Sequence, residues 1–235
     1  MPDNPTIGVV VPIFNEEVYL KQSLERLLKI EEIKQIILVD DCSTDSSFEI
    51  ALNYESKYQK ISSVQTDNNS GKGHAVQLGA TFLSTDYLIV HDADLEYFPE
   101  DIVEMYKEAI KLPESLIIGS RVKGDRERTN IYYSTYIGNK IFAYIFSIVN
   151  LTKLSDIASC YWLINLTTFR GLNLNEKGFA IEVEVLSKFL LTGSTIKEVP
   201  IKYEARSYEN GKKIKLKDAI SIFHKIIKYS KLFNS

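Results

Sequence analysis

Short runs of β-branched and other apolar residues recur along the first half of the chain. Each is followed by a segment with helical signals, and this alternation limits the possible folds more than any other feature. The runs predict strands at Ile7 to Val11, Ile36 to Val39, Ile61 to Gln65, Tyr87 to Val90 and Leu116 to Ile118. The segments between them carry helix-capping residues, a glycine turn or a proline suited to a first helical turn. Strands that alternate with helices predict an α/β fold, with a mostly parallel sheet and helices on both of its faces.

Polar side chains follow each of these predicted strands at the point where the strand ends. The clusters are Asn15-Glu16, Asp40-Asp41, Asn68 to Gly73, Asp92 to Asp94 and Ser120-Arg121. In open parallel sheets, ligands bind in the crevice outside the carboxyl ends of the strands. The sequence therefore predicts a binding site along that edge of the sheet.

The pattern changes after Arg121, where the regular alternation stops. No internal repeat or linker is evident, so a single domain is expected. The sequence predicts a polar loop at Lys123 to Asn130 and then an aromatic-rich helix at Thr135 to Asn150. It next predicts a strand at Tyr161 to Ile164, a helix at Ile181 to Leu191 and a strand at Thr195 to Tyr203. The last predicted element is an amphipathic segment at Leu216 to Phe233.

Composition narrows the class of protein. The chain has 235 residues, of which 45% are hydrophobic, and a formal net charge of −3. This content suits one globular domain, and the lack of a basic excess argues against a nucleic-acid partner. The two cysteines, Cys42 and Cys160, fit neither a disulfide framework nor a zinc site, which favours a reducing cytoplasm.

The longest apolar run extends from Ile141 to Val149, far short of the ~20 residues that a membrane-spanning helix needs. The polar N-terminus also lacks the pattern of a signal peptide. We therefore expect a cytoplasmic protein that is either soluble or peripheral at the membrane face. The apolar run itself either lines a lipid groove or belongs to the core.

Asp92-Ala93-Asp94 is the leading candidate for a metal site. The two carboxylates sit at the end of a predicted strand, where a turn can aim both at one ion, and their oxygens favour Mg²⁺ or Mn²⁺. Such an ion would neutralise a departing diphosphate. The alternative is a solvated acidic turn. The position after a buried strand, with Glu96 nearby, favours the metal.

Two further clusters could bind a nucleotide. Asp40-Asp41 could recognise a base or ribose, or could cap the following helix, a role that Asp45 can fill instead. The glycine loop Asn69 to Gly73 precedes a helix, so it either binds an anion or forms a tight turn with a solvated Lys72. It matches neither a Walker loop nor a dinucleotide fingerprint.

Basic residues gather in two places. Arg121 follows directly on a predicted strand and is favoured as a phosphate ligand, because arginine can bind phosphate through two parallel hydrogen bonds. Lys123, Arg126 and Arg128 extend this cluster, and a second basic loop runs from Arg206 to Lys213. The three histidines show no ligand spacing and are expected to be structural or solvent-facing.

Eight motifs now stand in order along the chain: VVVPIFNEE, ILVDDCSTDSS, NSGKGHAVQLG, DADLEYFPEDI, IGSR, SDIASCYWLI, GFAIEVEVL and EVPIKYEARSYENGKKIKLKD. Together they resemble the inverting family 2 glycosyltransferases of GT-A (Rossmann-like) fold, in particular the dolichyl-phosphate mannose synthase-like branch. The resemblance covers residues from about 6 to 230. It implies that Asp92, Asp94 and Glu96 hold Mg²⁺ or Mn²⁺. It also implies a nucleotide-sugar pocket formed by Pro12, Phe14, Asn15, Glu16, Asp40, Asp41, Lys72, Asp92 and Ala93.

The resemblance also implies a reaction, since members of this branch transfer a hexose from a GDP- or UDP-sugar to a polyprenyl phosphate. Residues 1–121 would form the nucleotide-sugar-binding half, residues 122–213 the acceptor half and residues 214–235 an amphipathic C-terminal helix. Asp94 and Arg121 would be catalytic. The residues expected to hold phosphate groups are Arg121, Arg128, Ser134, Arg206 and Lys212.

A sugar hydroxyl, as in surface-polysaccharide synthesis, is the alternative acceptor, and it would need a carboxylate base. Glu182 or Glu184 lies where the resemblance places such a base, and Glu182 is the preferred candidate. Two residues apart on a helix, they cannot both face the site. A non-catalytic nucleotide-sugar-binding protein is a remoter alternative. An NAD-dependent oxidoreductase is disfavoured, because the first strand–helix turn lacks a glycine triplet.

The C-terminal segment, residues 214–233, places most of its lysines off its apolar stripe. It could lie on a membrane surface, with the apolar side in the lipid and the lysines near anionic headgroups. The alternative is an ordinary helix packed on the sheet.

Overall fold

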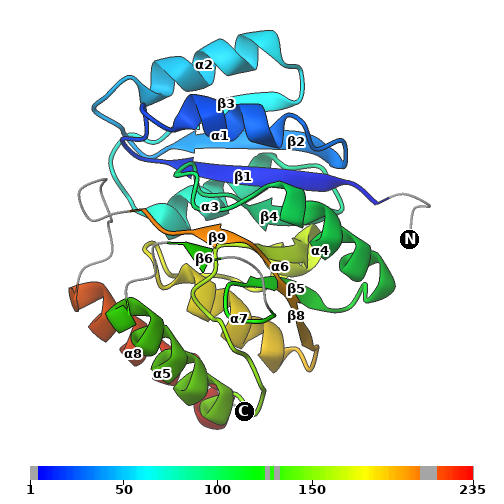
Figure 1. Cartoon of the computed structure of the whole chain (residues 1–235), viewed down its shortest axis with the longest axis vertical. Helices are drawn as coiled ribbons and strands as arrows, with labels where there is room; N and C mark the ends of the chain where they lie inside the picture. Colours follow the sequence, from blue (N-terminus) through cyan, green and yellow to red (C-terminus); the bar gives the residue numbers. More distant parts are fainter. Residues whose placement is uncertain (1–4, 125–127, 130–132, 207–215, 235) are drawn as a thin grey trace.

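A seven-stranded sheet forms the centre of the molecule in the computed structural model (Figure 1). The structure describes residues 5–124, 128–129, 133–206 and 216–234. The strands of the sheet are β1 (Ile7–Ile13), β2 (Ile33–Asp40), β3 (Ile61–Gln65), β4 (Tyr87–Val90), β5 (Leu116–Ser120), β7 (Trp162–Asn165) and β8 (Ile196–Pro200). Their order is β3–β2–β1–β4–β7–β5–β8, and β7 runs antiparallel to both of its neighbours while the other ladders are parallel. A separate ladder pairs β6 (Arg128–Thr129) with β9 (Tyr203–Glu204).

Helices cover both faces of this sheet. They are α1 (Leu20–Leu27), α2 (Ser47–Lys57), α3 (Lys72–Phe82), α4 (Glu100–Lys111), α5 (Tyr133–Val149), α6 (Leu166–Gly171), α7 (Ile181–Leu191), α8 (Leu216–Lys228) and α9 (Lys231–Asn234). Alternate residues of β1 point to opposite faces, so Val9 and Val11 join a core with α1, α2 and α4, whereas Val10 joins a core with α3, α5, α6 and α7. The predicted α/β fold is confirmed.

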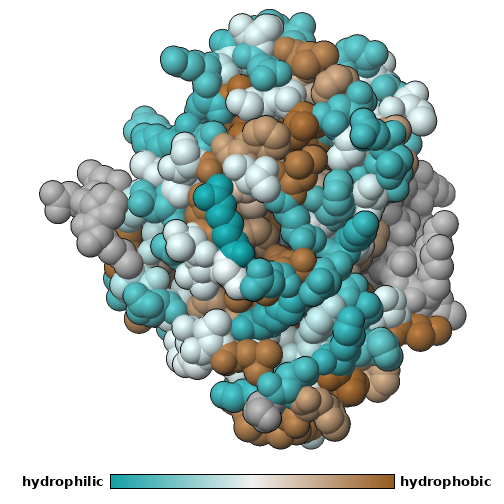
Figure 2. All heavy atoms as spheres, turned by 180° about the vertical axis from the view of Figure 1, so that it is seen from behind, coloured by the Kyte–Doolittle hydropathy of each residue, from teal (hydrophilic) through white to brown (hydrophobic). Residues whose placement is uncertain are grey.

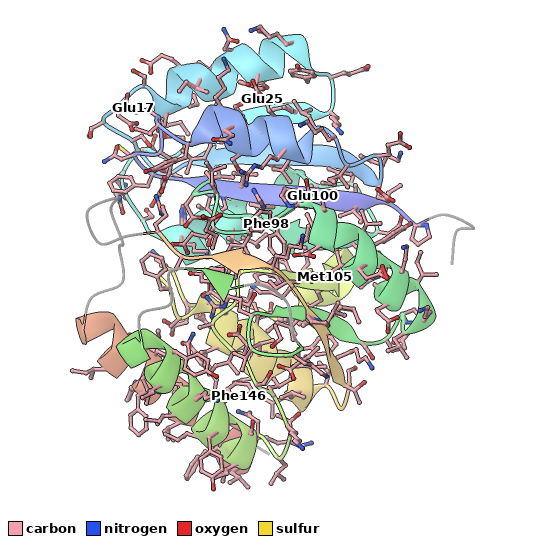
Figure 3. All side chains as sticks on the ribbon, in the orientation of Figure 1. Glu17, Glu25, Phe98, Glu100, Met105 and Phe146 are labelled. Atoms are coloured by element: carbon pink, nitrogen blue, oxygen red, sulfur yellow. The ribbon has the colours of Figure 1, made fainter. Side chains whose placement is uncertain are left out.

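The two cores are filled with large apolar side chains. Met105 of α4 and Phe146 of α5, labelled in Figure 3, are fully buried, one in each core. Full burial of one such side chain contributes about 1.5–3 kcal/mol. α5 also leaves Ile141 and Tyr144 exposed, so the predicted apolar run serves both the core and the surface. None of the helices in the described ranges is long and apolar enough to cross a membrane.

Some segments differ from the predicted elements. The strand expected from Thr195 to Tyr203 ends at Pro200, because the amide of Lys202 donates to the Asp101 carboxylate and the chain then pairs with β6. β6 itself lies inside the expected polar loop. The predicted short strand near Trp162 exists, but it enters the sheet antiparallel between β4 and β5.

The amphipathic segment at the C-terminus is broken into α8 and α9 rather than continuous. The hydroxyl of Ser230 donates to the carbonyl of Ile227, and the amide of Lys231 donates to the side chain of Asn150. These bonds replace the helical ones, so the chain turns between Lys228 and Lys231.

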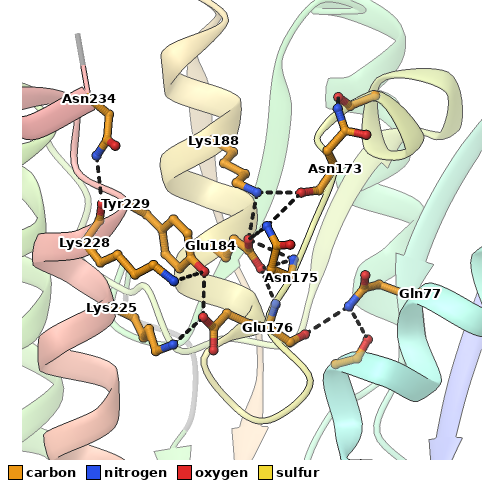
Figure 4. A network of polar contacts seen from close by, with 12 residues as sticks. Gln77, Asn173, Asn175, Glu176, Glu184, Lys188, Lys225, Lys228, Tyr229 and Asn234 are labelled. Carbon is orange, nitrogen blue, oxygen red and sulfur yellow. Dashed lines mark hydrogen bonds and ion pairs between the residues drawn. The ribbon is translucent and has the colours of Figure 1, made fainter.

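A polar network ties α8 to the segment 173–178 (Figure 4). The carboxylate of Glu176 accepts hydrogen bonds from Lys225 Nζ at 2.5 Å and from Tyr229 Oη at 2.6 Å. The amides of Asn175 and Glu176 donate to the buried carboxylate of Glu184 on α7. The segment is therefore fixed from both sides.

The backbone of this segment also packs on the N-terminus of α3. The carbonyl of Lys177 accepts the amide of His74 at 3.0 Å, and the carbonyl of Glu176 accepts the side chain of Gln77 at 3.0 Å. These contacts bring two backbone stretches that are about a hundred residues apart in sequence against one another.

Glycines make this close approach possible. A Cβ atom at Gly71 would overlap the carbonyl of Lys177, and one at Gly73 would overlap the carbonyl of Glu176. Gly71 also has a φ of +98°, a conformation that favours glycine. Lys72, between the two glycines, is positioned by the same packing.

Gly73→Ala should therefore destabilise the protein by about 2 kcal/mol or more, because the added methyl meets backbone atoms that cannot rotate away. Gly138→Ala on α5 is the control, since no described atom lies within 4 Å of its added Cβ. This control should be neutral or should stabilise the helix by about 0.5–1 kcal/mol. Urea denaturation measures both, and equal free energies of unfolding would contradict the close packing.

Candidate active site

The order of the strands reverses beside β1, and in sheets of this type the reversal creates the ligand-binding crevice. β2 and β3 extend the sheet on one side of β1, whereas β4 pairs with its other side. Glu16 follows the carboxyl end of β1, and Asp92 and Asp94 follow the carboxyl end of β4. The predicted clusters after these two strands are thus neighbours in space.

The guanidinium of Arg206 joins these clusters. Its Nη2 lies 3.0 Å from Asp94 Oδ2, and its Nη1 lies 3.2 Å from Glu16 Oε2. Its Nε lies 3.8 Å from Glu96 Oε1, and its Cζ lies 5.3 Å from the centre of the Tyr19 ring. The Arg206 side chain is only 13% exposed, so salt screens these ion pairs less than it would at the surface.

Lys72 forms a second bridge, between β4 and α7. Its Nζ lies 2.9 Å from Asp92 Oδ2 and 2.9 Å from Glu182 Oε1. Lys72 is therefore a buried ion-pair partner and not the solvated side chain of the alternative interpretation. Glu184 points away from this bridge and pairs with Lys188 at 2.8 Å. Of the two candidate bases, only Glu182 faces the site.

The pKa values of the two aspartates are shifted in opposite directions, because their charged neighbours differ. Burial, together with the negative charges of Asp92 and Glu96, raises the pKa of Asp94 to about 7, although Arg206 opposes the shift. Burial would also raise the pKa of Asp92, but the ammonium of Lys72 outweighs it and holds this pKa below its usual value. The acidic cluster is thus not fully neutralised by its two cations, a setting that favours binding of further positive charge.

The donor atoms at this edge suit a divalent cation. Asp92 and Asp94 offer carboxylate oxygens, the hard ligands that Mg²⁺ and Mn²⁺ prefer. Within the described residues, however, no three acidic, histidine or cysteine side chains are grouped so that they could hold an ion by themselves. Glu96 is engaged elsewhere, because it accepts from the Tyr203 hydroxyl at 2.6 Å and from the Arg206 amide at 2.9 Å. The predicted site of three carboxylates is therefore not preformed, and an ion here would need further oxygen ligands, as from a diphosphate.

Two residues beside the site have a left-handed backbone. Asn15 after β1 has a φ of +54°, and Leu95 between the acidic residues has a φ of +65°. Asparagine tolerates this conformation, whereas for leucine it costs on the order of 1–3 kcal/mol. At this turn Asp94 Oδ1 accepts the amide of Glu96 at 3.1 Å, which fixes the direction of the carboxylate.

His91, directly before Asp92, is a buried structural residue. Its Nε2 lies 2.9 Å from Ser23 Oγ, and its Nδ1 lies 2.7 Å from Tyr161 Oη. Burial lowers its pKa to about 4, so the ring is neutral near pH 7. The structural role expected for this histidine is confirmed.

Arg121 is held at the end of β5 by a buried acid. Its Nε and Nη2 each lie 2.8 Å from one carboxylate oxygen of Asp156, a geometry that fixes the plane of the guanidinium. Its Cζ lies 5.0 Å from the centre of the Tyr203 ring, and Tyr203 in turn donates to Glu96. Arg121 is therefore connected through Tyr203 to the acidic cluster.

The carboxylates of the two acids at the end of β2 accept hydrogen bonds from backbone amides of neighbouring turns. Both carboxylate oxygens of Asp40 accept the amide of Ser43, at 3.0 and 3.1 Å. The carboxylate of Asp41 accepts the amides of Ser70 and Gly71, at 2.9 and 2.6 Å. Neither acid bonds the first turn of α2, where Asp45 Oδ1 accepts the amide of Ser47 at 3.0 Å, and contact of Asp40 or Asp41 with a base or ribose stays a prediction.

The other residues predicted for the nucleotide pocket lie close to these turns. Asn15 Oδ1 accepts the amide of Thr44 at 2.8 Å. Pro12 lies within β1, Phe14 is half-buried just after it, and Ala93 is buried between the two aspartates.

Three of the predicted phosphate-binding side chains, those of Arg128, Ser134 and Lys212, lie outside the part of the chain that the structure describes. Conversely, Asp156 and Tyr203 had no predicted role. Both fall within the quoted motifs SDIASCYWLI and EVPIKYEARSYENGKKIKLKD, and that was the one signal that could have pointed to them.

Comparisons with known proteins identify the family of this chain. The family model described as Glycosyl transferase family 2 matches residues 8–171. The dolichol-phosphate mannosyltransferase of Pyrococcus furiosus is 32% identical over 86% of this chain. The match spans 57% of the length of that protein. The UDP-N-acetylglucosamine–dolichyl-phosphate N-acetylglucosaminyltransferase of Methanococcus voltae is 25% identical over 94% of each chain.

Solved structures share the fold. The glucosyl-3-phosphoglycerate synthase of Mycobacterium tuberculosis, crystallised with Mn²⁺, uridine diphosphate and glucosyl-3-phosphoglycerate, superimposes with a TM-score of 0.72 over 96% of this chain and 80% of its own. The sequence identity is 13%, so this likeness concerns the fold alone. The family match covers well over half of the chain and includes both aspartates of the acidic cluster and Arg121. The chain therefore belongs to glycosyl transferase family 2 and has its GT-A fold.

Proposed function

We propose that the chain is an inverting glycosyltransferase that moves a hexose from a GDP- or UDP-sugar to a polyprenyl phosphate. The observation that carries the proposal is the arrangement of charge at the carboxyl edge of the sheet. An acidic cluster around Asp92 and Asp94 is linked there through Tyr203 to the fixed guanidinium of Arg121. The acidic side suits a cation-bound donor diphosphate, and the basic side suits an acceptor phosphate. The relatives from P. furiosus and M. voltae are named for dolichol or dolichyl phosphate, which supports this acceptor class.

A phosphate acceptor needs positioning more than it needs a base. The second pKa of a phosphate monoester is about 6, so the group is largely ionised near neutral pH. Arg121, fixed by Asp156, offers a preorganised positive charge that could orient it. A phosphate oxygen would then form the new bond to the anomeric carbon as the nucleoside diphosphate leaves from the opposite face.

We further propose Mg²⁺ or Mn²⁺ as the cofactor, held by Asp92, Asp94 and the donor diphosphate. When bound, the ion would neutralise the charge that develops on the departing diphosphate. The M. tuberculosis synthase of the same fold was crystallised with Mn²⁺ and uridine diphosphate, which supports a divalent ion.

A sugar hydroxyl is the second candidate acceptor, and one observation favours it. Oε2 of Glu182 is buried and has no hydrogen-bond partner among the residues described. Burial also raises the pKa of this carboxyl. Beside the Lys72–Asp92 pair, Glu182 could serve as the base that a hydroxyl acceptor requires.

A surface rich in apolar side chains supports peripheral contact with a membrane. α8 buries Ile226 but exposes Ile220 and Phe223, and α9 exposes Leu232 and Phe233. Figure 2 shows hydrophobic side chains at the lower end of the molecule, where Figure 1 places α5, α8 and the C-terminus. The helix thus packs on the core and keeps an apolar face outside, so we propose that this face meets anionic lipid.

Asp94→Ala should remove the metal-dependent stabilisation by nucleotide sugars, because one of the two proposed ligands is lost. In a thermal-shift panel of GDP- and UDP-sugars, one nucleotide class should stabilise the wild-type protein in the presence of Mn²⁺. Glu104→Ala, which alters an exposed ion pair on α4, is the matched control and should behave like the wild type. Equal shifts in Asp94→Ala and the wild type would count against the metal site.

Radioactive hexose from the preferred donor should enter an organic-extractable product when a polyprenyl phosphate is supplied. The reason is that the sugar then becomes attached to a lipid. Label that enters only aqueous oligosaccharide, and is lost in Glu182→Gln, would contradict the phosphate acceptor and favour the hydroxyl.

The double variant Phe223→Glu, Phe233→Glu should sediment poorly with vesicles of anionic phospholipid, since charge replaces the apolar contact with the interface. Phe82→Glu is the control, because Phe82 is likewise exposed, at 50%, but belongs to α3 and not to α8 or α9. If the double variant sediments as well as the control, the proposed membrane face is wrong.

A further inference from the structure

The side chain of Glu176 connects the C-terminal helix α8 to a stretch of backbone beside the proposed donor site (Figure 4). Its carboxylate is only 12% exposed and accepts hydrogen bonds from Lys225 Nζ and Tyr229 Oη. Burial alone would raise the pKa of Glu176, but the bonds from these two side chains outweigh it and lower this pKa. The carboxylate is therefore charged near pH 7 and bonded to α8.

The helix α8 has a separate anchor, whereas the segment 173–178 has little else to hold it. Ile226 of α8 is fully buried in the core that also contains α5 and α7. The segment 173–178 belongs to no helix or strand, and Leu174 is its one apolar side chain that packs on the core. The polar contacts of Glu176 therefore serve mainly to position this segment.

The backbone of the segment 173–178 in turn completes the start of α3. The amide of His74 lies in the first turn of α3, where an N–H group has no partner within its own helix, and it donates to the carbonyl of Lys177 at 3.0 Å. The side chain of Gln77 donates to the carbonyl of Glu176 at 3.0 Å. Lys72 is the first residue of this helix, so the segment fixes the turn from which its side chain extends.

The ammonium of Lys72 must reach two acids at once. Its Nζ lies 2.9 Å from Asp92 Oδ2 and 2.9 Å from Glu182 Oε1, and its side chain is only 11% exposed. Hydrogen bonds weaken as distance and angle depart from their preferred values, so a small displacement of the α3 turn would weaken both contacts. The charge beside Asp92, where the donor diphosphate and its cation are proposed to bind, would change with it.

We propose that Glu176 is a positioning residue for donor binding, because it ties α8 to the segment 173–178 and thereby fixes the α3 turn that carries Lys72. This inference rests on the proposed function and adds to it a dependence of the donor site on the C-terminal helix. Glu176 does not touch the donor and acts through Lys72. Among the described residues, the Arg121–Asp156 pair takes no part in these contacts, so binding of the acceptor phosphate should not depend on them.

Lys225→Met is the test, because it removes the ion pair with Glu176 and leaves the proposed donor site unaltered. Lys111→Met is the matched control, since it removes another lysine–glutamate pair, that with Glu108 at 2.7 Å on α4. Transfer is measured in detergent solution without vesicles, so that contact of α8 with lipid does not contribute. Lys225→Met should raise the KM for the nucleotide sugar about fivefold and leave kcat and the KM for polyprenyl phosphate within about twofold. Lys225→Arg keeps the charge and should restore the wild-type values.

Hydrogen exchange gives a readout that does not depend on activity. In Lys225→Met, the amides of residues 72–77 should exchange faster than in the wild type, Lys225→Arg and Lys111→Met, because the bond from His74 to Lys177 opens more often. A variant that was merely less stable would lose active molecules, and with them kcat, while the KM for the donor stayed the same.

An unchanged donor KM in Lys225→Met would overturn the proposal. A raised donor KM with unchanged exchange would also overturn it, because the effect would then not pass through α3. An equal rise in Lys111→Met would do the same, since loss of any surface lysine would then be the cause. If the wild type used no nucleotide sugar at all, the proposed function would fail, whereas faster exchange in Lys225→Met would still support the dependence of the Lys72 turn on α8.

Discussion

Negative charge held largely away from water at the carboxyl edge of the sheet determines which parts of this molecule must come together. Asp92 and Asp94 follow β4 with side chains only 24% and 14% exposed, and a carboxylate so shielded is destabilising without a partner. Lys72 neutralises the first at 2.9 Å and Arg206 the second at 3.0 Å. One cation comes from the start of α3 and the other from the segment after β9, so the acidic edge holds the two halves of the chain together.

The position of Lys72 depends in turn on distant parts of the chain. The turn that contains Lys72 packs against the backbone of the segment 173–178. The two backbones can come this close because Gly71 and Gly73 have no side chains. The same segment is bonded to Glu184 on α7 and to Lys225 on α8. The C-terminal helix and the lysine of the acidic cluster therefore share one backbone support, which links the surface proposed to meet lipid with the site proposed to bind the donor.

The antiparallel strand β7 gives the site its width. It lies between β4 and β5, and neighbouring strands are about 4.8 Å apart, so the ends of β4 and β5 are separated by roughly 10 Å. Asp92 and Asp94 stand at one end of this gap and Arg121 at the other. Such a distance suits a sugar held between a donor diphosphate and an acceptor phosphate.

Local sequence pattern was enough to predict the elements and the edge that carries the site. The strands Ile61–Gln65 and Tyr87–Val90 match the predicted runs residue for residue, because strand periodicity and turn residues act over short stretches of chain. The polar clusters after β1, β4 and β5 were recognised for the same reason. The partners of these polar groups were not predictable in this way. Arg121 meets Asp156 across 35 residues, Asp41 turns to the amide of Gly71, and β7 enters the sheet in reverse. Such pairings depend on which segments lie next to one another at the sheet edge. That neighbourhood follows from the order of the strands, which arises from packing across the whole chain and has no local signature.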